Sequence, residues 1–351
     1  MAAWQSAWDR LHRACQAPPF LQSRFVARAL QFFGTGRERI AIAGPAGESV
    51  AMAVLTSDAW GRWHTFQPSQ LPLGAWLMRP GLGYAETARG VFDLLPGVPL
   101  MLAITQQDPS LFSRPDDGHG IRSMDHFDSG WIDIRGDFDA YWRTRSPHLR
   151  QNLRTQLSRL RRQEAPPRLE VLTDPADMAG AIDDYARLES SGWKAAGGTA
   201  LASGTPQACF YRAVMEDYCS NGQGTAYRLW FGDRVVAIDL CIAADGVEVL
   251  LKTTYDESVR GLSPSTILKY HALQRHFEQG DLSRCEYYGT FMPWTSLWTA
   301  RRRRFFHVNC FRWLMVDQLR QWVRRWHRPS IEAHVLSPDQ SALPVHDRPA
   351  L

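Results

Sequence analysis

No stretch of this 351-residue sequence reaches the roughly 18 uncharged apolar residues that a membrane-spanning helix needs. The first segment, MAAWQSAWDRLHRACQ, carries charges inside its apolar periodicity, so it lacks the uncharged core of a secretory signal peptide. The six cysteines are scattered and show neither C-x-x-C nor Cys/His ligand spacing. We therefore expect a cytoplasmic protein with reduced thiols and no metal.

Charge is ordinary in amount but uneven in distribution. Hydrophobic residues make up 44% of the chain and charged residues 22%, as in soluble globular proteins. The net charge of +4 conceals two basic stretches: residues 141–163 hold seven arginines and no acid, and residues 301–328 hold nine arginines against Asp317. Each stretch is either a solvated helix face or a contact for an anionic nucleotide, an RNA or an acidic membrane surface.

Hydrophobic periodicity predicts the same order of elements in both halves of the chain. In the first half, helices precede a hairpin (RIAIAG and SVAMAVLTS), a strand (RWHTF), a helix (YAETARGVFDLL) and a buried strand (VPLMLAIT). The second half has helices before a three-strand meander that ends in VEVLLKTTY, then a loop and helix, then the strand RCEYYG. Strand, strand, strand, helix, strand occurs twice, which indicates duplicated α/β domains with mixed sheets.

The predicted organisation has four parts. An N-terminal lobe covers 1–130 and a C-terminal lobe covers 131–310, and the second lobe is expected to hold the larger cleft. Residues 107–130 are rich in Asp, Ser, Gly and Pro and read as a linker or long loop. An amphipathic helix is expected over 311–328 and a flexible tail over 329–351.

The segment ESVRGLSPSTILKYHALQRHF, residues 257–277, joins a strand to a helix. Ser263 and Ser265 are suited to cap the helix, and Pro264 suits its first turn. Free backbone N–H groups at a helix start can bind an anion. The alternative is a well-capped helix with no further role.

These residues resemble the GNAT N-acyltransferase family, whose core has this strand order and an anion-binding loop before the helix. The family's pyrophosphate loop reads Arg/Gln-x-x-Gly-x-Gly/Ala, and the segment from Arg260 to Ser265 keeps the arginine and the spacing, with serine for both glycines. The segments SPHLRQNLRTQLSRLRR, LESSGWK, VVAIDLCIA and TTYDESVRGLSPSTIL look like the BioF2-like branch associated with cellulose biosynthesis (CelD/BcsL). The first half resembles a degenerate first GNAT lobe, as in tandem Fem-type transferases.

The resemblance implies acyl-CoA, with acetyl-CoA the expected form, as donor. It also implies that backbone N–H groups around Leu251 to Thr253 polarise the thioester carbonyl. The residues implied to bind the donor are Arg260, Gly261, Leu262, Ser263, Ser265, Thr266 and Lys252.

Transfer to an amine needs a proton acceptor and a proton donor. Tyr288, at the end of the strand after the loop helix, is the candidate acid, unless it only packs at a sheet edge. Asp239 and Glu189 are the candidate bases. Trp193 and Lys194 are candidates to line the acceptor cleft, although a helix C-terminus also explains the lysine.

Three functions remain open from the sequence. The first is an acyl-CoA-dependent N-acyltransferase acting on a small-molecule or glycan-precursor amine. The second is a Fem-like transferase that takes an aminoacyl group from tRNA, with the arginines of 141–163 on RNA phosphates, but no aromatic residues are interleaved among Arg150, Arg154, Arg161 and Arg162. The third is an inactive GNAT-fold module that docks on a membrane or a synthase through 311–328.

Overall fold

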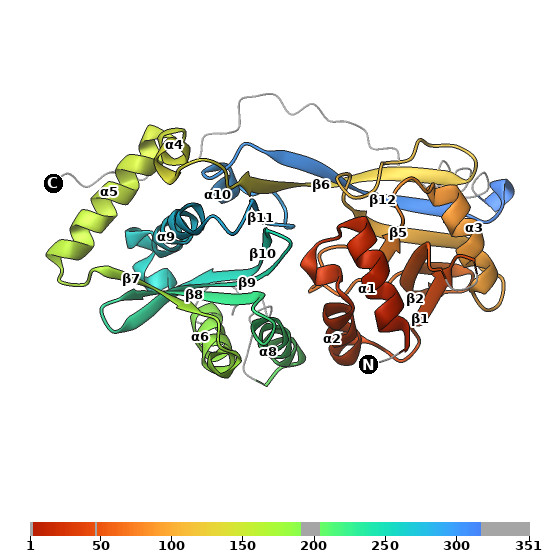
Figure 1. Cartoon of the computed structure of the whole chain (residues 1–351), viewed down its shortest axis with the longest axis horizontal. Helices are drawn as coiled ribbons and strands as arrows, with labels where there is room; N and C mark the ends of the chain where they lie inside the picture. Colours follow the sequence, from red (N-terminus) through yellow and green to blue (C-terminus); the bar gives the residue numbers. More distant parts are fainter. Residues whose placement is uncertain (1–2, 46–47, 191–203, 317–351) are drawn as a thin grey trace, which may run out of the picture.

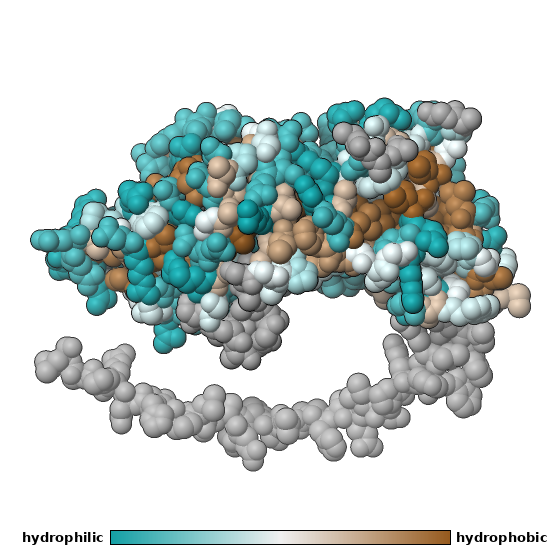
Figure 2. Space-filling view, turned by 90° about the horizontal axis from the view of Figure 1, so that it is seen from below, coloured by the Kyte–Doolittle hydropathy of each residue, from teal (hydrophilic) through white to brown (hydrophobic). Residues whose placement is uncertain are grey.

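The computed structural model describes residues 3–45, 48–190 and 204–316. It shows two lobes side by side, bridged by two long strands that run across the top of the molecule (Figure 1). On the face seen in Figure 2, hydrophobic surface gathers over the N-terminal lobe, and the outer end of the C-terminal lobe is mainly hydrophilic. None of the helices in the described ranges is long and apolar enough to cross a bilayer.

The helices and short 3-10 turns are α1 (Ala3–Cys15), η1 (Pro19–Leu21), α2 (Ser23–Phe33), α3 (Tyr84–Leu94), α4 (Phe138–Arg143), α5 (Pro147–Arg162), η2 (Pro175–Asp177), α6 (Met178–Ser190), α8 (Pro206–Cys219), η3 (Glu257–Leu262), α9 (Pro264–Gln279) and α10 (Pro293–Ser296). The strands are β1 (Arg39–Ala43), β2 (Ala51–Ala59), β3 (Arg62–Thr65), β4 (Trp76–Met78), β5 (Met101–Gln107), β6 (Ile121–Asp133), β7 (Pro167–Leu172), β8 (Gly224–Phe231), β9 (Arg234–Ala244), β10 (Val247–Tyr255), β11 (Arg284–Glu286) and β12 (Arg302–Phe311).

All strands belong to one mixed sheet in the order β1-β2-β3-β5-β12-β6-β11-β10-β9-β8-β7, with β4 paired to β2. The repeat predicted from the sequence is visible in the pairing. In the first lobe β1, β2 and β3 are antiparallel neighbours, and β3 pairs in parallel with β5 after α3. In the second lobe β8, β9 and β10 are antiparallel, and β10 pairs in parallel with β11 after α9. The mixed α/β fold class is therefore confirmed.

The strand that follows each unit crosses into the other lobe. β6, which follows the first unit, pairs at its end with β11 of the second. β12, which follows the second unit, pairs with β5 of the first. The two exchanged strands also pair with each other along most of their length. A boundary between residues 130 and 131 thus runs through β6, and β12 lies in the sheet of the N-terminal lobe although its residues come from the predicted C-terminal range.

Two sequence-based predictions in this region are wrong. Residues 121–130 form most of β6 rather than a linker, and the basic run beginning at Arg301 leads directly into β12. The charged residues of both strands conceal the alternating hydrophobic pattern by which a strand is recognised, and several of them form ion pairs across the sheet. Arg304, for example, donates to Asp128 of β6, and its Nη2 lies 3.1 Å from the Asp128 Oδ2. The helix and tail predicted over 311–328 and 329–351 lie almost entirely outside the described residues.

A buried ion network joins the two lobes where the strands cross. The guanidinium of Arg303 (β12) donates to both carboxylate oxygens of Asp108, just after β5, at 2.7 and 2.6 Å, and to Glu286 of β11 at 2.9 Å. All three side chains are at most 10% exposed. Burial raises the pKa of Glu286 to about 7, although Arg303 acts in the opposite direction. One guanidinium thus holds two buried carboxylates from different lobes.

Helix packing also connects the lobes. The ring of Phe25 in α2 meets Phe210 of α8 edge to face, with 5.4 Å between ring centroids. The Tyr218 hydroxyl donates to the Pro19 carbonyl at 2.6 Å. One hydrophobic core therefore continues from α1 and α2 into α6 and α8. The lobes form one folded unit rather than two independent domains joined by a linker.

Candidate functional site

The start of α9 is built differently from the predicted serine cap. Ser263 occupies the N-cap position in a left-handed backbone conformation, with φ 54°, and in the described structure its side chain makes no capping hydrogen bond. Its hydroxyl instead accepts from the Asn152 amide of α5 at 3.3 Å. The first N–H groups of a helix have no intrahelical acceptor. The backbone N–H groups of Ser265 and Thr266 are therefore placed to donate to an acceptor outside the helix.

The left-handed residue also explains the family pattern at this position. Glycine adopts a positive φ without the clash that other residues suffer. Ser263 stands where the pyrophosphate loop of the family has its first glycine, and it adopts a positive φ despite its side chain. The left-handed conformation that favours glycine is therefore present at this position.

β10 has a free edge beside this helix start. It pairs with β11 only over Val247–Val249, because β11 ends at Glu286. On its other side the register with β9 shifts: Leu250 faces Cys241 and Lys252 faces Leu240, so Leu251 is an extra, bulged residue. A bulge takes its backbone out of the regular ladder. This is the stretch for which the resemblance implies N–H groups that polarise a carbonyl.

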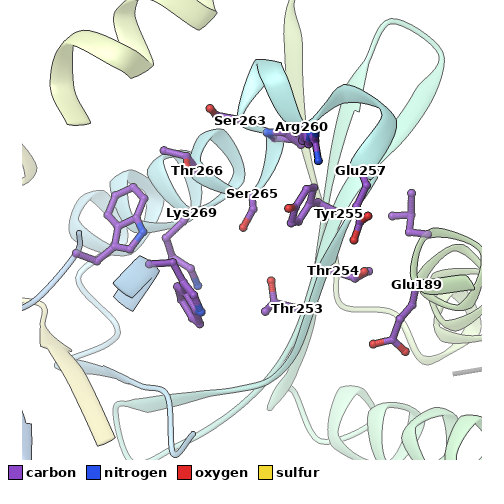
Figure 3. Close-up of a pocket in the computed structure, with 14 residues that line it drawn as sticks. Glu189, Thr253, Thr254, Tyr255, Glu257, Arg260, Ser263, Ser265, Thr266 and Lys269 are labelled. Carbon is purple, nitrogen blue, oxygen red and sulfur yellow. The ribbon is translucent and has the colours of Figure 1, made fainter. Parts of the chain in front are cut away.

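A cavity of about 430 Å³ lies between α9 and the end of β10. Ser265 and Lys269 of α9 point into it from one side, and Thr253 of β10 from the other (Figure 3). Arg260, which is exposed, stands at its rim on η3. The remaining lining residues are Leu188, Glu189, Thr254, Tyr255, Glu257, Ser263, Pro264, Thr266, Trp294 and Trp298.

Asp239 lies behind the cavity wall rather than in it. Its carboxylate accepts from Lys269 Nζ at 3.0 Å, and the two side chains are 3% and 14% exposed. Burial by itself would lower the pKa of Lys269, but the carboxylate of Asp239 and the neighbouring groups raise it well above its usual value. Asp239 therefore keeps Lys269 protonated, so the pair delivers a positive charge to the cavity and Asp239 is poorly placed to act as a free base.

Glu189 reaches the cavity from the end of α6. Its side chain is buried, accepts from the Tyr185 hydroxyl at 3.1 Å and lies 3.8 Å from Lys252 Nζ. Lys252 also stands over the rings of Tyr185 and Tyr211 at 5.6 and 5.5 Å from their centroids. Of the three predicted catalytic residues, Glu189 is the one whose carboxylate lines the cavity.

Tyr288 lies on the far side of β11, away from the cavity. Its ring packs on Phe20 of the N-terminal lobe, with 4.7 Å between centroids, and Arg303 stands over it at 5.2 Å. Burial raises its pKa well above the usual value. The neighbouring Tyr287 is nearer the donor side, since Lys269 Nζ is 5.6 Å from its ring centroid. Tyr288 as the acid stays a prediction without support from its position.

The structure brings most of the predicted donor residues together. Arg260, Ser263, Ser265 and Thr266 all line the cavity. Gly261 and Leu262 belong to η3, beside the lining residues but outside the cavity wall. Trp193 and Lys194 lie outside the described residues.

Lys269 was missed by the sequence analysis, although the composition holds a signal for it. Only three of the forty basic residues are lysines, at 194, 252 and 269. A lysine ammonium is a compact charge whose pKa responds to burial, whereas arginine is always charged. In a chain that uses arginine almost everywhere, the rare lysines are therefore candidates for a specific role, and the two that the structure describes, Lys252 and Lys269, have side chains 19% and 14% exposed.

One group of potential metal ligands occurs within the described residues, at the other end of α9. Ligand atoms of Glu248, His276 and Cys285 all lie within 4.8 Å of one another. Glu248 already accepts from the Tyr227 hydroxyl at 2.9 Å and lies 3.1 Å from His276. The pKa of Glu248 is lowered by His276 in spite of burial. These contacts satisfy the hydrogen-bonding capacity of the Glu248 carboxylate within the protein. We therefore interpret the three residues as a hydrogen-bond network.

Three solved structures share the fold of the chain at low sequence identity. FemX aligns over 92% of this chain and 99% of its own, with a TM-score of 0.57 and 8% identity. The C-terminal domain of a putative lysylphosphatidylglycerol synthetase from Agrobacterium fabrum covers 91% and 95%, with a TM-score of 0.54 and 12% identity. L-PGS from Bacillus licheniformis covers 89% and 94%, with a TM-score of 0.51 and 13% identity. None of the curated proteins matches the chain.

A family model matches part of the chain. It covers residues 147–295, which run from the first residue of α5 through α9 and β11 to α10 and include every residue that lines the cavity except Trp298. The family is described as an acetyltransferase (GNAT) domain. The chain therefore contains a region that matches a GNAT acetyltransferase domain, set within a larger two-lobed fold.

Proposed function

We propose that this protein is an acyltransferase that moves an acyl group, with acetyl as the expected one, from acyl-CoA to an amine. The observation that carries the proposal is the cavity at the start of α9. There the first helix amides, Arg260 and the buried ammonium of Lys269 converge beside the free edge of β10. Helix amides and a guanidinium bind phosphate oxygens without a metal, and the cavity lies within the region that matches the GNAT domain.

The chemistry of each residue follows from its place. The amides of Ser265 and Thr266, with Arg260, would hold the pyrophosphate of the donor. The bulged backbone at Leu251 would donate to the thioester carbonyl oxygen. Glu189 would accept the proton that the amine loses as its nitrogen bonds to the carbonyl carbon, and Lys269 would hold positive charge against the sulfur as the carbon–sulfur bond breaks.

The acceptor in this proposal is an amine on a small molecule or a glycan precursor, in polysaccharide or cell-envelope biosynthesis. Its support is the resemblance of several sequence segments to the BioF2-like branch.

Variants of the loop test donor binding. Arg260→Ala should weaken acetyl-CoA binding by about 1.5–3 kcal/mol, the range for a hydrogen bond to a charged group. Ser265→Asp should weaken it at least as much, because it places a carboxylate against the phosphates. Ser263→Gly is the matched control: glycine adopts the observed φ of 54° without strain, so the loop path and the affinity should be kept.

Calorimetric titration of acetyl-CoA measures the three affinities, with circular dichroism as the folding control. Wild-type affinity in both Arg260→Ala and Ser265→Asp would show that the loop begins a helix and does not bind the donor. The acyltransferase proposal would then rest on the family match alone, a weak warrant for function.

A second candidate donor is an aminoacyl-tRNA, and one observation favours it. The outer face of α5 exposes Arg154, Arg159, Arg161 and Arg162, and α5 touches the loop through the contact of Asn152 with Ser263. This basic face could follow an RNA backbone toward the cavity. Binding of tRNA that weakens steeply with salt, together with no binding of acetyl-CoA, would support this donor instead.

A further inference from the structure

A second cavity, of about 390 Å³, opens at the junction of the lobes beside the same edge of β10. Residues 67–72 of the N-terminal lobe line it, together with Tyr211 and Tyr287 of the C-terminal lobe. Leu250 and Leu251 belong to this cavity, whereas Thr253, two residues further along the strand, belongs to the first. The bulge of β10 therefore lies between the two cavities, within reach of both.

The two cavities differ in charge. The first is lined by two carboxylates and two cations: Glu189, Glu257, Arg260 and Lys269. Among the described residues that line the second, none is an acid, a base or a histidine. Its polar groups are amides and hydroxyls: those of Gln67, Ser69, Gln70, Gln106, Tyr211 and Thr290 among them. Burial raises the pKa of Tyr211 and of Tyr287, so both tyrosines stay protonated and uncharged.

Three residues that line the second cavity have unusual features. Tyr287 has a buried hydroxyl without a hydrogen-bond partner among the described residues, although buried polar groups are nearly always paired. Gln106 and Tyr288, which also line the cavity, both have a positive φ, of 42° and 50°. Strained backbone of this kind gathers at functional sites. Gln106 lies near the end of β5 and Tyr288 just after the end of β11, which are the parallel strands of the two lobes.

We propose that this cavity is the acceptor site and that it takes an amine carried on an uncharged, hydroxyl-rich body, as in an amino sugar. Amides and hydroxyls can donate to and accept from such hydroxyl groups, and the tyrosine rings offer apolar faces. A polyamine or an amino acid would bring a further charge into a cavity without a counter-ion, which is costly. The inference rests on the proposed acyl transfer, because the acceptor nitrogen must reach a carbonyl held at the bulge.

Binding of the acceptor can be measured without the donor. Saturation-transfer NMR with glucosamine as the probe should show contact with the wild-type protein. Thr290→Trp, which places a large ring at the exposed mouth of the cavity, should weaken that binding by about tenfold or more. Ser220→Trp adds the same ring at the exposed residue that follows α8, outside the cavity lining, and should leave binding unchanged.

The transfer reaction gives the second readout, as release of free CoA thiol from acetyl-CoA. Glucosamine should be a better acceptor than spermidine or lysine by about tenfold or more in kcat/KM. Gln70→Glu should reduce the preference for glucosamine over spermidine and lysine. The new carboxylate can pair with the additional charge that spermidine and lysine carry. Thr290→Trp should lower kcat/KM for glucosamine with an unchanged affinity for acetyl-CoA.

The outcomes separate this inference from the proposed function. Transfer that is unaffected by Thr290→Trp, or that favours spermidine in the wild type, would overturn the acceptor site while leaving the acyltransferase intact. Glucosamine binding that Thr290→Trp removes, in a protein that does not bind acetyl-CoA, would keep an amino-sugar site and overturn the acyl-CoA donor. Glucosamine that does not contact the protein at all would overturn the inference directly.

Discussion

Replacing Lys269 with methionine is expected to lower the free energy of unfolding by about 3–5 kcal/mol, because it leaves the buried carboxylate of Asp239 without its cation. The same change should lower acetyl transfer by about a hundredfold, as the loss of a preorganised charge at a reacting centre does. Chemical denaturation and thiol release measure the two effects separately.

The double variant Lys269→Met with Asp239→Asn distinguishes the two roles. It removes both charges of the pair, so stability should return to within about 1 kcal/mol of the wild type. Transfer should stay as low as in the single variant, because the positive charge of the cavity is still missing. Activity that recovers together with stability would show that Lys269 only supports the fold.

Removal of β12 is expected to abolish cooperative folding. A chain that ends at residue 301 loses the strand that lies between β5 and β6 and joins the sheets of the two lobes. It also loses Arg303 and leaves Asp108 and Glu286 as two buried carboxylates without their shared partner. We expect no sigmoidal thermal transition and an aggregated or strongly dye-binding product.

A chain that ends at residue 316 is the matched control, because it keeps β12 entire. It should unfold cooperatively, and so should the full chain. A soluble, cooperatively folding chain that ends at 301 would contradict the exchanged-strand architecture. It would instead support the division into independent lobes that the sequence suggested.

The repeated order of strands and helices could be predicted from the sequence because each unit carries clear periodicity. Ile267, Leu268, Ala272 and Leu273 are buried on α9 at helical spacing, and the apolar run VVAIDLCIA is buried along nearly all of its length in β9. The exchange of β6 and β12 could not be predicted in this way. Both strands are rich in Asp or Arg, and only the fold shows that Arg304 meets Asp128 from a segment 176 residues away.

The candidate site could likewise be predicted from the sequence only in part. The loop from Arg260 to Thr266 was found because anion binding at a helix start depends on local sequence. The pair of Lys269 with Asp239 was not found, because it joins α9 to β9 across 30 residues of chain and neither residue has a motif around it. Tyr288 was chosen from its place after a strand, but the left-handed turn at that residue sends its ring toward Phe20.

Hydrogen exchange of the backbone amides, measured with and without acetyl-CoA, tests the central claim most directly. The donor should protect the amides of 263–267 at the start of α9 and of 250–254 along the free edge of β10. The arginine face of α5 should change little. Protection confined to α5, seen with tRNA and absent with acetyl-CoA, would contradict the acyl-CoA site and move the donor to the basic helix.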